Sequence, residues 1–208
     1  MPLSKRRTQT SKRVMMAATL FSDLETVRFA GTETDNPLAY RYYDAERVVL
    51  GKPLRDHLRF AVAYWHSLAM NGSDPFGAPT LKRPWMNQAD PMQGARDKAD
   101  AAFDLFRVLD VPFYSFHDRD IAPDGEDLNS SLRNFHEMVD YLGTKMQSSK
   151  TRLLWGTANL FSNPLFMAGA ATNPDPEVFA YSAATVKHCM DATKTLGGDN
   201  YVLSLIHI

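Results

Sequence analysis

The stretch VPFYSFHDRDIAPDG, residues 111–125, decides the fold class of this chain. Its first seven residues, 111–117, are apolar on both alternating faces, which is typical of a parallel strand in a sheet covered on both sides. Pro123 and Gly125 then turn the chain. The residues HDRD, 117–120, lie between the strand and the turn, so side chains that can carry chemistry gather where the predicted strand ends.

Strand and helix patterns alternate on both sides of this stretch. Apolar runs predict further strands at 59–66, 152–159 and 201–206, and apolar residues at helical spacing predict helices at 95–110, 128–146 and 176–198. Strands that alternate with helices are typical of a mostly parallel α/β sheet. A doubly wound sheet is the rival topology, but the first strand is followed by DPFG rather than by a glycine-rich phosphate loop.

Overall composition excludes several classes of partner. The 208 residues carry 23 Lys and Arg against 24 Asp and Glu, a net charge of −1, so we expect no nucleic-acid partner. No apolar run is long enough to span a bilayer, so we expect no membrane partner. The single cysteine, Cys189, excludes an internal disulfide and a thiolate metal cluster, and it fits the reducing conditions of the cytoplasm.

The two ends of the chain differ from its middle. Residues 1–22 contain five basic residues and no acid, which predicts a basic, disordered leader, with a weak transit peptide as the alternative. At the other end, no helix follows the predicted strand 201–206, so an apolar strand edge would be left unpaired. We therefore expect the chain to be truncated.

Loops at the C-terminal ends of the strands carry the chemistry of an α/β barrel. In this chain those ends hold Trp65, His66, His117, Asp120, Thr157 and Asn159. His117 and Asp120 are three residues apart across a turn, so the carboxylate can accept a hydrogen bond from the imidazole and fix its tautomer. We interpret this pair as a general acid/base unit.

Other interpretations of these residues remain open. His117 could instead ligate a metal or belong to a salt-bridged surface turn, although the other histidines lack HxxxH or HExxH spacing. Asp118 and Arg119 are interpreted as a local charge pair, which contributes little if it is exposed. A Ser115 nucleophile is disfavoured because the GxSxG elbow is missing. Solvated or capping positions are predicted for His57 and His136.

Several long stretches resemble one enzyme family. FHDRDIAPDG, LLWGTANLFSNPLFM, GAATNPDPEVFAY and LGGDNYVL are similar to the xylose (glucose) isomerases of the subgroup with a longer N-terminal region, over about residues 20 to 203. The resemblance implies a (β/α)8 TIM barrel, of which this chain holds about the first half, at 23–203. It also implies interconversion of D-xylose with D-xylulose and of D-glucose with D-fructose, two divalent cations (Mg, Mn or Co), and a homotetramer when full length.

The resemblance also assigns roles to individual residues. It implies that His117 promotes opening of the cyclic sugar and that Asp120 orients His117. Aromatic residues at Trp65 and Phe161 are expected to line the sugar pocket, and Phe76 is expected to reach into the pocket of a neighbouring subunit. The expected substrate-binding set is Trp65, Phe76, Thr157, Asn159 and Phe161.

The chain departs from the family pattern in its last residues. The family continues after YVL with the Glu, Asp and His ligands of both cations, whereas residues 204–208 look like a non-native tail, so no metal ligand is expected here. Leu165 and Ala168 replace an Arg and a His common in the family. We therefore expect the isolated chain to be inactive and poorly folded. The alternatives are a sugar-binding or assembly fragment without catalysis, and a metal-dependent TIM-barrel hydrolase.

Overall fold

The computed structural model of the chain describes residues 20–21, 23–74 and 76–203. The predicted tail at 204–208 lies outside the described residues, as does the predicted leader apart from its positions 20 and 21. Among the described helices, none combines the length and the apolar character needed to cross a bilayer.

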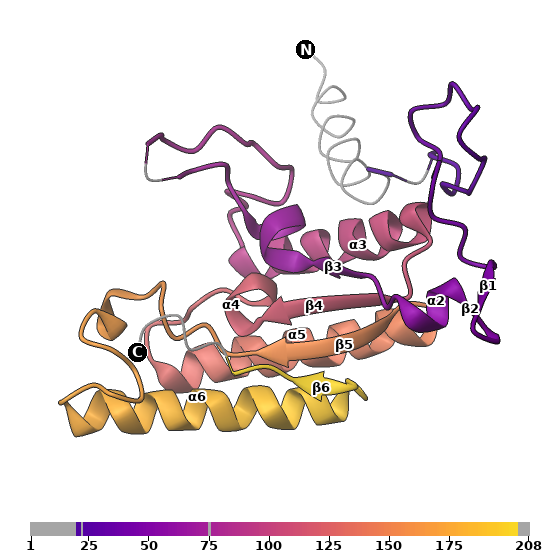
Figure 1. Cartoon of the computed structure of the whole chain (residues 1–208). Coiled ribbons are helices and arrows are strands. Elements are labelled where there is room, and N and C mark those ends of the chain that lie inside the picture. The colour runs from indigo at the N-terminus through magenta and orange to yellow at the C-terminus, as the bar shows by residue number, and fades with distance from the viewer. Residues whose placement is uncertain (1–19, 22, 75, 204–208) are drawn as a thin grey trace, which may run out of the picture.

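A four-stranded parallel sheet forms the centre of the fold (Figure 1). Its strands follow the chain in the order β3 (Ala61–Ala63), β4 (Phe113–His117), β5 (Arg152–Thr157) and β6 (Asn200–Tyr201). The sheet is open in the described part of the chain, and no closed barrel is seen. The α/β class with a parallel sheet is confirmed, and the four strands in sequence order agree with a partial barrel.

Helices connect successive strands of this sheet. The helices are α3 (Pro91–Leu109), α5 (Leu128–Gln147) and α6 (Pro176–Thr195). α5 packs against both α3 and α6, and α6 also packs against β5. Each helix begins with an aspartate that caps it, and at α6 the predicted cap is confirmed because Asp175 accepts the N–H of Glu177 at 2.8 Å.

Side chains on the helix side of β4 and β5 build the core. Tyr114 and Phe116 are fully buried, and Tyr114 stacks on Phe106 of α3 with ring centroids 5.5 Å apart. Gly156 in β5 allows α6 to approach closely, since a Cβ at this position would lie 2.4 Å from the Thr193 hydroxyl oxygen. The alternate residues of β4 point to the other side of the sheet, where His117 lies.

The predicted first strand at 59–66 is partly wrong. Only Ala61–Ala63 is extended, and Trp65 and His66 belong to the π-helix η2 (Trp65–Ala69). Tyr64 and Leu68, four residues apart, are both buried, so helical geometry from Tyr64 onward places two large side chains in the core. An apolar run of this length is compatible with either strand or helix, and packing decides between them.

Other boundaries also differ from the predictions. The helix expected from 95 begins at Pro91, and the turn expected after His117 is the short helix α4 (Asp118–Ile121). The strand expected at 201–206 is the two-residue β6 within the described residues. The hairpin of β1 (Val48–Val49) and β2 (Lys52–Pro53), which is followed by α2 (Leu54–His57), was not predicted.

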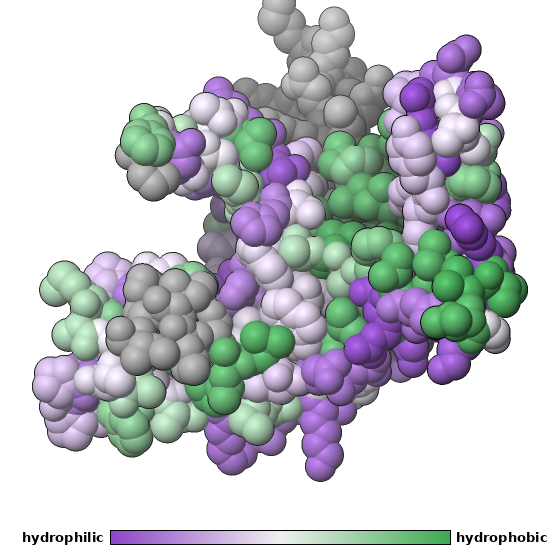
Figure 2. All heavy atoms as spheres, in the orientation of Figure 1, coloured by the Kyte–Doolittle hydropathy of each residue, from purple (hydrophilic) through white to green (hydrophobic). Residues whose placement is uncertain are grey.

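Exposed apolar side chains gather on that unpredicted hairpin. Figure 2 shows them over β1 and β2, and Val48 and Leu50 are 69% and 93% exposed. The central sheet, by contrast, buries all five residues of β4. The well-packed part of the chain is therefore the sheet with its three long helices, and the candidate site lies at the C-terminal end of this part.

Candidate active site

His117 and Asp120 form a buried pair at the end of β4. The imidazole Nδ1 lies 3.0 Å from Asp120 Oδ2, and the same oxygen accepts the backbone N–H of His117 at 2.7 Å. This double contact arises because α4 begins at Asp118, which places Asp120 in the capping position of its first turn. Both side chains are about nine-tenths buried, so the alternative of an exposed salt-bridged turn is wrong.

The Asp120 contact determines which ring nitrogen of His117 can react. An ionised carboxylate only accepts hydrogen bonds, so Nδ1 carries the proton and donates it to Asp120. Nε2 on the other side of the ring is then left with a lone pair that can take a proton from a ligand. The pair therefore has the geometry of a general base held by a carboxylate, as the spacing in the sequence predicted.

Aromatic rings enclose the imidazole. Trp65 contacts it edge to face with centroids 4.8 Å apart, and Phe161 does so at 5.5 Å. Trp155 extends the wall, with its ring 5.4 Å from that of Trp65. Three aromatic side chains from β5, η2 and the loop after β5 thus form one apolar surface beside the imidazole of His117.

Trp155 is a site residue that was missed from the sequence. The register pairs Trp155 with Ser115 and Thr157 with His117, so Trp155 lies on the same face of the sheet as the histidine. The sequence could have indicated it, because Trp155 and Thr157 are two residues apart in a predicted strand and alternate residues of a strand share a face. Thr157 itself is 1% exposed and lies beside His117, as expected for neighbouring strand ends.

Asp118 ties the ends of β4 and β5 together. Its Oδ1 accepts the backbone N–H of Asn159 at 2.7 Å, and its Oδ2 pairs with Arg119 Nε at 3.5 Å. The predicted charge pair of Asp118 with Arg119 is therefore present, and Asp118 is buried in it, with 2% of its surface exposed. Burial raises the pKa of Asp118, while Arg119 and the N–H of Asn159 act in the opposite direction.

Asn159 organises the loop that carries Phe161. Its side-chain oxygen accepts the N–H of Phe161 at 3.2 Å, and it accepts both the N–H and the hydroxyl of Ser162, at 3.0 and 2.8 Å. These three bonds fix the start of the loop next to His117. Within the described residues, Asn159 therefore contributes to the site by placing Phe161.

Phe76 does not join this group in the single chain. It is 97% exposed on the long loop between η2 and α3, which stands away from the central sheet in Figure 1. The Asp74 carboxylate accepts the N–H of Phe76 at 2.7 Å and so shapes the tip of this loop. Of the predicted site residues, Trp65, His117, Asp120, Thr157, Asn159 and Phe161 come together, and Phe76 and His66 remain exposed.

Comparison with known proteins identifies the family of the chain. No family model matches it. The xylose isomerase of Ruegeria pomeroyi is 58% identical over 183 residues, which is 88% of this chain, and that of Chelativorans sp. is 55% identical over 188 residues, or 90% of this chain. The chain belongs to the xylose isomerase family. It spans 42 to 43% of the length of these relatives.

The cations implied by the xylose isomerase resemblance do not fit the residues described here. No group of three or more His, Cys, Asp or Glu side chains is placed to hold a metal ion in residues 20–21, 23–74 and 76–203. Asp118 and Asp120 are engaged with Arg119 and His117, and Cys189 is buried in an environment that raises the pKa of its thiol. No chemical step is therefore derived through a cation.

Proposed function

We propose that the complete protein containing this sequence is an aldose–ketose isomerase that interconverts D-xylose with D-xylulose and D-glucose with D-fructose. The observation that carries the proposal is the buried His117–Asp120 pair, which faces a wall formed by Trp65 and Phe161. The isomerases among the relatives support the same reaction class.

The pair supplies the chemistry of ring opening. A cyclic sugar opens when a base takes the proton of the anomeric hydroxyl and the bond from the anomeric carbon to the ring oxygen breaks as the carbonyl forms. His117 Nε2 accepts that proton and then gives it to the ring oxygen, which completes the open chain. Asp120 holds the tautomer and stabilises the imidazolium between the two transfers.

The aromatic wall binds the sugar and keeps water away. The face of a sugar that carries C–H groups packs on aromatic rings, and its hydroxyl groups need a few fixed polar partners. Trp65 and Phe161 provide such rings on two sides of His117.

The proposed assembly uses Phe76. We propose that residues 23–203 form the first half of the barrel and that the complete protein is a cytoplasmic homotetramer. Phe76 supports the tetramer, because an aromatic ring that is 97% exposed at the tip of a loop is a suitable contact for a neighbouring subunit.

A ring-opening assay in the complete protein tests the role of His117. We expect His117→Gln to lower the turnover of cyclic xylose at least ~100-fold while turnover of an open-chain analogue falls far less, because only the first substrate needs the base. His66→Gln, which changes an exposed histidine next to Trp65, is the matched control. Equal losses of turnover on the two substrates would show that His117 has no role in ring opening.

A sugar-binding fragment without catalysis is a second candidate function. The observation that favours it is the aromatic wall in a chain whose described residues offer no metal-binding group. Thermal denaturation of the 208-residue chain with and without xylitol, in the presence of a chelator, tests it. Stabilisation under these conditions supports binding by the chain alone, and an unchanged melting temperature speaks against it.

A further inference from the structure

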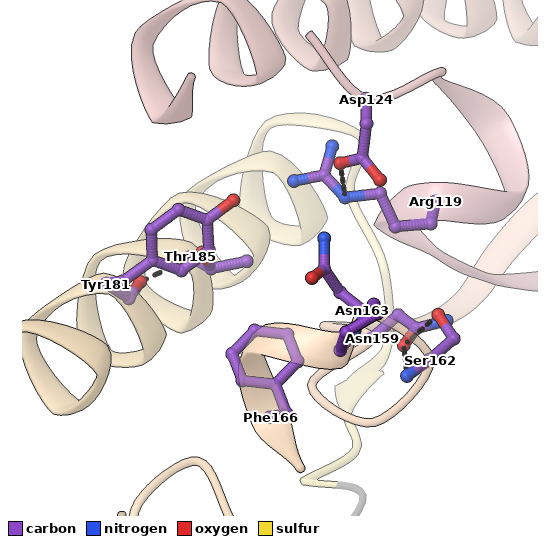
Figure 3. Close-up of a pocket in the computed structure, with 9 residues that line it drawn as sticks. Arg119, Asp124, Asn159, Ser162, Asn163, Phe166, Tyr181 and Thr185 are labelled. Carbon is purple, nitrogen blue, oxygen red and sulfur yellow. Dashed lines mark hydrogen bonds and ion pairs between the residues drawn. The ribbon is translucent and has the colours of Figure 1, made fainter. Parts of the chain in front are cut away.

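A second polar pocket lies on the helix side of the loop after β5. Its volume is about 180 Å³, and it lies between α4, the 3-10 helix η3 (Pro164–Phe166) and α6 (Figure 3). Its main lining residues are Arg119, Asp124, Asn163, Phe166, Tyr181 and Thr185. None of the aromatic rings around His117 belongs to this lining, although Arg119, Asn159 and Ser162, which were described with the His117 site, do.

Two side chains bring hydrogen-bond donors to the pocket. Arg119 uses Nε to pair with Asp124 at 2.9 Å and with Asp118 at 3.5 Å. Figure 3 shows one terminal nitrogen of its guanidinium directed toward α6, and no described residue accepts a hydrogen bond from the buried Nη1. The Asn163 oxygen accepts the N–H of Leu165 at 2.9 Å, which leaves the amide nitrogen to donate beside Arg119.

Other side chains bring acceptors to the same space. The Thr185 hydroxyl donates its hydrogen to the carbonyl oxygen of Tyr181 at 3.0 Å, and the Ser162 hydroxyl donates to the side-chain oxygen of Asn159 at 2.8 Å. Each hydroxyl has thus used its only hydrogen and presents lone pairs. The Asp124 carboxylate adds further acceptor sites beside Arg119.

The mixture of donors and acceptors selects the ligand chemistry. An anion without O–H groups, such as sulfate, only accepts hydrogen bonds, and Asp124 would repel any anion, whereas Arg119 would repel a cation. A hydroxyl group both donates and accepts, so a molecule with several hydroxyls can satisfy both kinds of partner. Phe166 and Tyr181, with ring centroids 6.0 Å apart, add an apolar side against which C–H groups can pack.

We propose that this pocket binds a small neutral polyol. Its volume is several times the ~30 Å³ that one water occupies in the liquid, which suits a molecule of a few carbon atoms rather than an oligosaccharide. Its lining includes neither His117 nor the aromatic rings around it, and the proposal does not depend on the isomerase activity. Because Arg119 follows Asp118 on α4 and Asn159 borders the pocket, a bound polyol would contact the loop that carries Phe161.

Titration of the full chain with erythritol tests the proposal. Heteronuclear NMR spectra of the ¹⁵N-labelled chain are expected to show saturable shifts of the amide signals of Asn163, Phe166 and Tyr181. Thr185→Val keeps the shape of the side chain and removes its acceptor, so we expect at least fivefold weaker binding. Thr195→Val is the matched control on the same helix, because Thr195 makes the same bond to the fourth residue before it but is exposed.

A second variant addresses the donors. Asn163→Asp keeps the oxygen that accepts the Leu165 N–H but loses the amide donor, so erythritol binding is expected to weaken while the loop keeps its cap. Linear, non-saturating shifts in the unchanged chain, or equal affinity of the unchanged chain and Thr185→Val, would overturn the proposal. Saturable binding of inorganic sulfate in place of erythritol would overturn it as well, in favour of an anion site.

Discussion

Histidine takes part in two side-chain pairs of the described residues, His117–Asp120 and His136–His188, and the surroundings of the two pairs differ. His117 is buried beside a carboxylate and two aromatic rings at the end of the sheet. His136 of α5 and His188 of α6 share a hydrogen bond of 3.0 Å on the helix surface. His117 contacts a carboxylate that stabilises its charged form, whereas His136 and His188 contact each other, and two imidazolium rings repel.

This difference separates a reactive histidine from a structural one. A histidine that acts as a general base becomes positively charged when it accepts a proton, so its neighbours have to stabilise the imidazolium. Asp120 does this for His117. For His188, burial is the largest cause that lowers the pKa, followed by His136 and Lys187, while Asp191 acts in the opposite direction. The pair on the helices can link α5 with α6 only while at least one ring is neutral.

Removing the carboxylate beside His117 is expected to have the largest effect. In the complete protein, Asp120→Asn should lower turnover of cyclic xylose ~100-fold or more, because the amide no longer fixes the proton on Nδ1 or stabilises the imidazolium. Steady-state kinetics of the variant measure this. The control is His136→Gln, in the exposed pair, which should retain normal turnover; a comparable loss in the control would erase the distinction between the two histidines.

Asp118 offers a stability test of the buried site. Asp118→Ala leaves the N–H of Asn159 without its acceptor and removes one of the two carboxylates paired with Arg119, so we expect a loss of about 2–3 kcal/mol in the free energy of unfolding. Urea denaturation of the chain measures it. Asp191→Ala removes an exposed partner of Lys187 on α6 and should cost well under about 1 kcal/mol. Similar losses in the two variants would mean that the buried link contributes no more than a surface ion pair.

The His136–His188 pair predicts a small pH effect. The pKa of His188 is lowered in the folded chain from its ordinary value of 6.5, so below this value the unfolded chain binds more protons than the folded one. The contribution of His188 is therefore complete above pH 6.5 and decreases as the pH falls below it. Urea midpoints measured from pH 7.5 to 5 should show a shallower decrease for His188→Gln than for the unchanged chain. Parallel curves for the two chains would show that protonation of His188 does not change the stability.

Parts of the fold followed from local pattern. The helices α5 and α6 and the strand β4 were predicted close to their observed bounds, because the helices have long apolar periods with an aspartate cap and the strand is a continuous apolar run. The Trp65 segment was not predicted correctly, since its short apolar run fits a strand as well as a helix, and burial of Tyr64 and Leu68 decided the outcome.

Some contacts of the candidate site could also be predicted from the sequence, and others could not. The His117–Asp120 contact could be predicted because both residues lie within one turn of α4. The bond from Asn159 to Asp118 joins residues 41 apart, and the bond from His136 to His188 joins residues 52 apart. Neither follows from spacing, because both depend on which elements pack side by side.

The sequence by itself determined the alternation of strands and helices, the family, and the carboxylate beside His117. Each of these depends on residues close together in the chain or on whole stretches of similarity. Only the tertiary structure decided that Asp118 is buried, that Trp155 joins the aromatic wall, and that side chains of α4, η3 and α6 line one pocket. The physical reason is that the burial of a side chain and the identity of its contact partners depend on distant segments. These contacts arise only when the sheet and its helices have packed together.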